Sequence, residues 1–89
     1  MEKTLFRPEY RILLGLLRHA RTDAGVTQER LASTLAVPRS TITKWETGQQ
    51  RMDLLEFCSF CEGMGVDPVD LLARFKEALK KDVGSRSRK

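Results

Sequence analysis

The sequence contains few of the residues from which catalytic and metal sites are usually built. It has one histidine, two cysteines and no glycine-rich phosphate loop. Its carboxylates form no pair that would converge on a cleft, and we find no nucleophile–base pair. We therefore expect no enzymatic activity, no cofactor and no bound metal.

The two cysteines, Cys58 and Cys61, have CxxC spacing, but both common functions of that motif are disfavoured. A structural zinc site normally needs four ligands, and the only histidine, His19, lies far away in the sequence. The redox motif follows a strand, and no strand-like pattern precedes this pair. Cys61 instead shares a helical stripe with Phe57, Phe60 and Met64, which predicts a small apolar core residue.

Long hydrophobic runs are also missing. The longest apolar stretch is residues 12–17, well short of the roughly 18–20 residues that span a bilayer. The first ten residues lack the organisation of a signal peptide. We expect a soluble cytoplasmic protein with no membrane partner.

The net charge of +4 is unevenly distributed along the 89 residues. Residues 80–89 carry five basic residues and one acidic residue, which accounts for the whole excess. Most of the charged residues between positions 18 and 51 are basic, and most of those between positions 53 and 77 are acidic. Such polarity would orient the molecule toward the phosphates of DNA as it approaches.

The pattern is helical throughout, and local signals predict five short helices. Pro8 would begin the first helix and Gly25 would end it. Thr27 would cap the second, and Pro38, after a turn at residues 36–37, would begin the third. Gly48 would close that helix. Asp53 would cap a fourth running to about Gly63, and residues 67–68 would open the fifth.

The spacing of apolar residues predicts which faces are buried. The expected inward residues are Tyr10, Leu13, Leu14, Leu17, Leu31, Ala32, Leu35, Ile42, Trp45, Leu54, Phe57, Phe60, Cys61, Leu71, Leu72, Phe75 and Leu79. We therefore expect an all-α, compact five-helix domain over residues 1–79. The apolar pattern stops near Lys81, and we expect residues 80–89 to form a basic, disordered tail.

Residues 26–48 are the most informative part of the chain. They predict two short helices folded against each other, with Arg39, Ser40, Thr43 and Lys44 pointing outward from the second. A short helix with a basic, hydroxylic outer face, braced by another helix, suits the major groove of DNA. This surface carries hydrogen-bonding groups that can read base edges.

Several spaced motifs resemble the helix-turn-helix domain of the phage repressor and Cro (XRE-like) family. They are Arg18-x-x-Arg21, Gly25-Val26-Thr27-Gln28-x-x-Leu31-Ala32, Ser40-x-Ile42-x-Lys44-Trp45-Glu46-x-Gly48 and Gly65-Val66-x-x-x-x-Leu71-Leu72. The resemblance covers about residues 10–73 and implies a lambda-repressor-like fold, with the helix-turn-helix at about residues 27–47. Residues 50–57 also resemble a loop found in small bacterial and phage regulators.

The resemblance implies a role for each matched position. Arg39, Ser40, Thr43 and Lys44 would read bases, and Arg21 and Glu46 would form an internal salt bridge. Gln28 would bind a backbone phosphate and buttress the first residue of the third helix. The other expected backbone contacts are Thr27, Thr41, Gln49, Gln50 and Arg51. At position 38 the family often has a serine or threonine cap, so Pro38 is a departure that leaves backbone N–H groups at that end without a side-chain cap.

General chemistry supports some of these roles. Arginine can form a bidentate pair with guanine, so Arg39 predicts a guanine in each half-site. Thr43 suits a thymine methyl group, and Lys44 suits either a base or a phosphate. Two roles remain open for Ser40: it contacts DNA, or it only faces solvent.

The leading hypothesis is a sequence-specific transcriptional regulator that represses by occupying an operator. Two copies would bind double-stranded DNA as a homodimer, because one such domain buries little surface. The expected dimer surface is the fifth helix with its neighbours, including Phe75, Leu79, Ile12 and Leu16. The alternative at that surface is packing within one chain, with Leu5 and Phe6 covering those residues.

Two rival functions remain open. One is an antitoxin that binds a toxin protein and represses its own operon. The other is an interaction adaptor that has lost DNA binding, which the outward cations Arg39 and Lys44 argue against. The basic tail would either add non-specific phosphate affinity or have no role.

Overall fold

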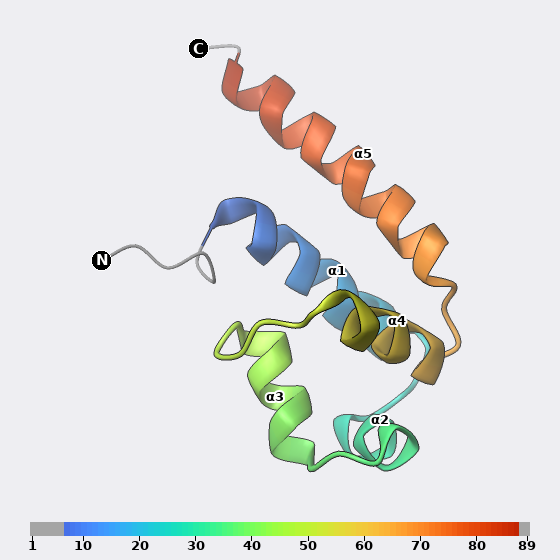
Figure 1. The fold of residues 1–89 in the computed structure, drawn as a ribbon. Coiled ribbons are helices and arrows are strands. Elements are labelled where there is room, and N and C mark those ends of the chain that lie inside the picture. The colour runs from blue at the N-terminus through green and yellow to red at the C-terminus, as the bar shows by residue number, and fades with distance from the viewer. Residues whose placement is uncertain (1–6, 88–89) are drawn as a thin grey trace.

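The computed structural model describes residues 7–87, with side chains described as far as residue 81. The described chain forms five α-helices (Figure 1): α1 (Pro8–Asp23), α2 (Gln28–Leu35), α3 (Arg39–Thr47), α4 (Leu54–Gly63) and α5 (Pro68–Ser87). No strand occurs in this part of the chain, so the predicted all-α, five-helix class is confirmed.

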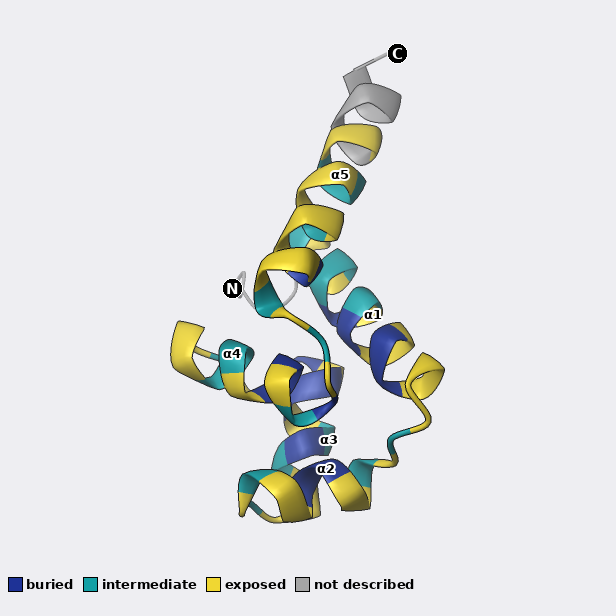
Figure 2. Ribbon diagram, turned by 90° about the vertical axis from the view of Figure 1, so that its right-hand side faces the viewer, coloured by how far each residue is buried: buried dark blue, intermediate teal, exposed yellow. Residues whose placement is uncertain are grey.

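The core is built from all five helices. Each contributes one almost fully buried large side chain: Leu17, Leu31, Ile42, Phe60 and Leu71. Figure 2 shows the buried residues gathered where α1, α3 and α4 meet, while most residues in the described part of α5 are exposed. This arrangement follows from the helical spacing of apolar residues, which places one stripe of each helix toward a common centre.

Local capping signals set the ends of the helices. The hydroxyl of Thr27 accepts a hydrogen bond from the backbone N–H of Arg30 at 3.0 Å. Asp53 and Glu56 form a reciprocal capping box at the start of α4, with N···O distances of 2.7 and 2.8 Å. Gly48 ends α3 with a φ of 82°, a left-handed conformation that suits glycine.

Three features differ from the sequence predictions. Pro38 lies at the N-cap, so the first residue of α3 is Arg39. Leu54 and Leu72, expected to point inward, are 74% and 48% exposed. Leu54 is the first residue of α4 and projects beyond the core. Leu72 directly follows the buried Leu71, and because neighbouring residues of a helix lie on different faces, Leu72 faces away from the core.

The third difference is the length of α5, which continues to Ser87 rather than ending near Lys81. The helix therefore includes most of the segment expected to be a disordered tail. An apolar stripe reports where a helix is buried, not where it ends. Lysine and arginine, which make up five of the ten residues of this segment, are good helix formers.

Candidate nucleic-acid interface

The connection between α2 and α3 is a tight turn held by backbone hydrogen bonds. Ala36 adopts a left-handed conformation with a φ of 58°. The next N–H, from Val37, donates to the carbonyl of Ala32 at 3.0 Å. This pattern closes α2 and reverses the chain within two residues. The turn thereby sets α3 against α2, as a helix-turn-helix requires.

The two faces of α3 have different environments. Ile42 and Trp45 are buried, and the ring of Trp45 lies 6.3 Å from that of Phe60, so Trp45 belongs to the core as predicted. The predicted base-reading residues lie on the other side. Arg39, Ser40 and Lys44 are exposed and Thr43 is half-buried.

A buried ion pair ties α1 to the end of α3. Arg21 donates from Nε to Glu46 Oε2 at 2.5 Å and from Nη2 to Glu46 Oε1 at 3.1 Å. Its remaining nitrogen, Nη1, donates to the carbonyl of Val26 at 2.8 Å. Both side chains are almost fully buried. The paired geometry satisfies charges that would otherwise be costly to bury, and it fixes the angle of α3.

Gln28 connects this ion pair to the exposed face of α3. Its Nε2 donates to Glu46 Oε1 at 2.9 Å. Because a carboxylate can only accept, the amide must present its NH₂ to Glu46 and its oxygen to α3. That oxygen accepts from Arg39 Nε and from the hydroxyl of Thr43, each at 3.3 Å. The buried pair thus orients two of the predicted base-reading side chains.

These residues surround a polar cavity of about 520 Å³ between α1, α2 and α3. We call it the polar groove; it is lined by Arg18, Arg21, Thr27, Gln28, Glu29, Arg39, Glu46 and Thr47. Arg18, Glu29 and Thr47 had no predicted role at this site. The spacing of Arg18 three residues before Arg21, on the same side of α1, is the sequence signal that could have identified it.

The residues expected to contact the DNA backbone are distributed over several elements. Thr27 is exposed at the start of α2, and Thr41 is half-buried in α3. Gln49 and Gln50 are exposed in the loop after α3, where the N–H of Gln50 donates to the carbonyl of Lys44 at 3.2 Å. That bond holds the loop against the C-terminal part of α3.

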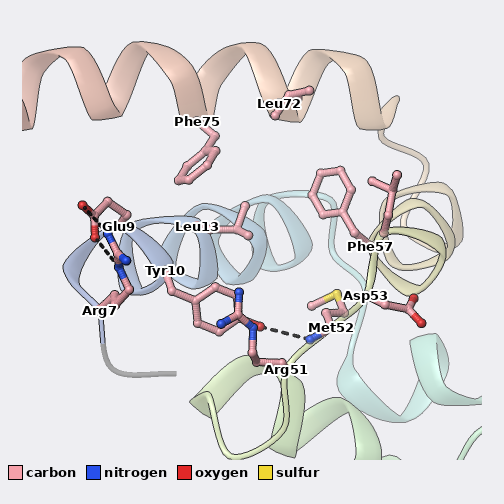
Figure 3. Close-up of a pocket in the computed structure, with 11 residues that line it drawn as sticks. Arg7, Glu9, Tyr10, Leu13, Arg51, Met52, Asp53, Phe57, Leu72 and Phe75 are labelled. Carbon is pink, nitrogen blue, oxygen red and sulfur yellow. Dashed lines mark hydrogen bonds and ion pairs between the residues drawn. The ribbon is translucent and has the colours of Figure 1, made fainter. Parts of the chain in front are cut away.

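Arg51, the last predicted phosphate contact, lines a different cavity (Figure 3). Its guanidinium carbon lies 5.0 Å from the centre of the Tyr10 ring, a cation–π contact. The Tyr10 hydroxyl accepts from the backbone N–H of Met52 at 3.2 Å. Tyr10 therefore anchors the loop between α3 and α4 to α1.

This second cavity, about 530 Å³, is an open apolar groove between α1, α5 and the start of α4. Its apolar lining is Tyr10, Leu13, Met52, Leu54, Phe57, Leu72 and Phe75. We call it the apolar groove. Figure 3 shows Phe75 pointing from α5 toward Leu13, while Leu72 lies along α5 at the edge of the groove.

The two cysteines are partly or fully covered by the surrounding structure. Cys61 is buried in the core and Cys58 is half-buried, and neither is in a disulfide. Burial, with smaller contributions from Cys58, Glu62 and Asp67, raises the pKa of Cys61 to about 11. Among the described residues, no cluster of three potential metal ligands occurs. Within the same part of the chain, no helix has the length and apolar character to cross a bilayer.

The fold and the polar groove define a helix-turn-helix DNA-binding domain, and comparisons with known proteins agree. The family profile described as a helix-turn-helix domain matches residues 12–75. Among solved structures, an XRE-family like protein from Pseudomonas syringae pv. tomato str. DC3000 is similar, with a TM-score of 0.76 and 43% identity. The match covers 79% of this chain and 85% of that protein.

A second solved structure, the clp gene regulator ClgR from Corynebacterium glutamicum, has the same fold, with a TM-score of 0.75 and 22% identity. That match covers 91% of this chain and 86% of the other. No curated protein sequence matches this chain significantly. The chain belongs to the XRE-like helix-turn-helix family of DNA-binding transcription regulators, which confirms the resemblance drawn from the sequence.

Proposed function

We propose that this protein is a sequence-specific repressor that binds a two-fold operator as a homodimer. The observation that carries the proposal is the orientation of the Gln28 amide. Glu46 accepts a hydrogen bond from the Gln28 NH₂ group, so the Gln28 amide oxygen is left to accept hydrogen bonds from Arg39 and Thr43 on the exposed side of α3. Side chains restrained before binding lose less freedom on binding, which favours selective recognition of bases.

In this proposal Arg39 pairs with a guanine and Thr43 contacts the neighbouring base, with Ser40 and Lys44 at the ends of the reading face. Gln28 has one N–H left after its bond to Glu46, and that N–H suits a phosphate oxygen. The remaining phosphate contacts are Thr27, Thr41, Gln49, Gln50 and Arg51. These contacts would set affinity and register, because phosphates carry no direct sequence information.

The apolar groove and the exposed side of α5 support the dimer. Leu72 is 48% exposed, and Phe75, Leu79, Ile12 and Leu16 are half-buried along α5 and α1. Contiguous exposed apolar residues commonly mark interaction surfaces. A second copy on this side would pair two recognition helices, and a spacing of about one DNA turn would favour a palindromic site.

Selection of bound duplexes from a random pool tests this function. The wild-type chain should select a two-fold consensus containing a guanine in each half-site. Arg39→Ala should lose about 1–3 kcal/mol of discrimination at that base pair and little elsewhere. Gln28→Ala should weaken binding to all sequences and also lower the preference at the Arg39 position. A pool that yields no enriched sequence would contradict the proposal and favour an interaction adaptor.

A further inference from the structure

The guanidinium of Arg39 has a second neighbour on α2 besides Gln28. Its Nη1 lies 3.7 Å from Oε2 of Glu29, while its Nε donates to Gln28 Oε1 at 3.3 Å. Two consecutive residues in the first turn of α2 therefore flank one cation of the recognition helix. Both side chains of the Arg39–Glu29 pair are well exposed, at 61% and 74%, so neither is needed for the core.

These two neighbours determine which part of Arg39 is available to DNA. A guanidinium has five N–H donors in a fixed plane. Gln28 takes the one on Nε, and Glu29 attracts one on Nη1. Within the described chain, none of the four Nη donors makes a hydrogen bond, because Glu29 approaches Nη1 only to ion-pair distance. They form the end of the fork, which matches the O6 and N7 acceptors of guanine.

We propose that Glu29 is a specificity-determining positioning residue that acts through Arg39. The inference rests on the proposed function, because it concerns the base that Arg39 reads. The Glu29 carboxylate keeps the guanidinium beside α2 with its terminal fork toward the groove. It also disfavours the alternative in which Arg39 swings away to a phosphate, a contact that would carry no sequence information.

Glu29 has two effects on DNA binding, and their signs differ. As a negative charge bordering the polar groove it repels phosphates of every sequence, so its removal raises affinity for any duplex. As a holder of Arg39 it favours guanine over other bases, so its removal lowers the ratio of specific to non-specific affinity. A residue that only repelled DNA would leave that ratio unchanged.

A third effect needs a matched control, because Glu29 is also the acidic residue in the first turn of α2 and favours that helix end. Asp70 is likewise an acidic residue in the first turn of a helix, α5, and is exposed. It does not line the polar groove. Asp70→Asn therefore removes the same charge from the same kind of helix position without touching Arg39.

The test measures the affinity of the full chain for the selected duplex and for duplexes carrying each other base at the Arg39 position. Glu29→Gln should lower discrimination for guanine about threefold, the scale of an exposed ion pair, while raising affinity for random duplex. Asp70→Asn should leave discrimination unchanged. In an Arg39→Ala background, Glu29→Gln should have no effect on base preference.

The outcomes separate the two proposals. A wild-type consensus with unchanged guanine discrimination in Glu29→Gln overturns the role of Glu29 and leaves the repressor proposal standing. An equal loss in Asp70→Asn, or a loss that persists without Arg39, also overturns it. A wild-type chain that selects no sequence overturns both proposals together.

Discussion

The polar groove and the apolar groove hold their side chains in different ways. In the polar groove, Arg21, Glu46, Gln28 and Arg39 are linked by hydrogen bonds whose donors and acceptors fix each orientation. In the apolar groove, side chains such as Leu72 are held only by contact and remain partly open to solvent. Directional bonds suit a surface that discriminates between bases. An open apolar surface suits association, because the hydrophobic effect has no direction.

The largest expected effect is on the buried ion pair. Arg21→Met leaves the carboxylate of Glu46 buried without its cation, which should lower the free energy of unfolding by about 3–5 kcal/mol. Urea denaturation measures this change. Arg18→Met is the matched control, because Arg18 is an exposed arginine one turn earlier in α1. Its free energy of unfolding should stay within about 0.5 kcal/mol of wild type.

A double variant separates stability from recognition in the same network. Arg21→Met with Glu46→Leu removes both charges, so it should recover most of the stability lost in the single variant. It should not recover base preference, because the Gln28 amide loses the partner that orients it. Full recovery of preference in the double variant would show that the ion pair does not position the reading face.

Two glycines test how tightly each region is packed. Gly63 lies where α4 packs against α2. A Cβ added to it would lie 2.7 Å from Cδ1 of Leu31, which is fully buried. Gly63→Ala should therefore cost about 1–3 kcal/mol. Gly15, on the exposed side of α1, has nothing within 4 Å. Gly15→Ala should stabilise the protein by about 0.5–1 kcal/mol, and opposite melting-temperature shifts would confirm the contrast.

The buried thiol of Cys61 gives a pH dependence with a defined sign. Its folded-state pKa is raised to about 11, while the unfolded thiol ionises near 9.0. Ionisation therefore favours the unfolded chain as pH rises from 9.0 to about 11. Relative to Cys61→Ala, the wild type should lose about 1–2 kcal/mol of stability over this range and nothing below it. Parallel stability curves for the two proteins would contradict the prediction.

The smallest effect on stability is expected in the apolar groove. Leu72→Ser should change the free energy of unfolding by less than about 1 kcal/mol, because Leu72 is half exposed. It should nevertheless shift sedimentation toward the monomer, since it places a hydroxyl in the proposed interface. Leu55→Ser, at an exposed leucine of α4 outside the groove lining, is the control and should leave association unchanged. Equal sedimentation of the two variants would count against this surface as the dimer contact.

Much of the fold could be predicted because its signals are local. Thr27, Gly48 and Asp53 mark helix ends through bonds to residues at most four positions away, or through one backbone angle. The end of α5 could not be predicted from the apolar stripe, because residues of high helix propensity such as lysine and arginine can continue a helix beyond such a stripe. Leu54 was predicted to be buried but is exposed, because it is the first residue of α4 and lies beyond the part of the helix that packs on the core.

The site was predicted less completely, because its contacts cross between helices. The pairing of Arg21 with Glu46 and the support that Gln28 gives to the start of the third helix were implied by the family resemblance rather than by spacing. The approach of Glu29 to Arg39 and of Arg51 to Tyr10 depends on how α2 and the α3–α4 loop sit in three dimensions. Neither contact leaves a periodic trace in the sequence.

The most direct test of the DNA-reading surface is a chemical-shift titration of ¹⁵N-labelled protein with the selected duplex. The largest changes should fall on the amides of α3, on the side-chain NH₂ of Gln28 and on Nε–H of Arg39, and they should diminish when the guanine paired with Arg39 is replaced. Changes confined to α5 and the apolar groove, with the resonances of α3 unmoved, would contradict the account.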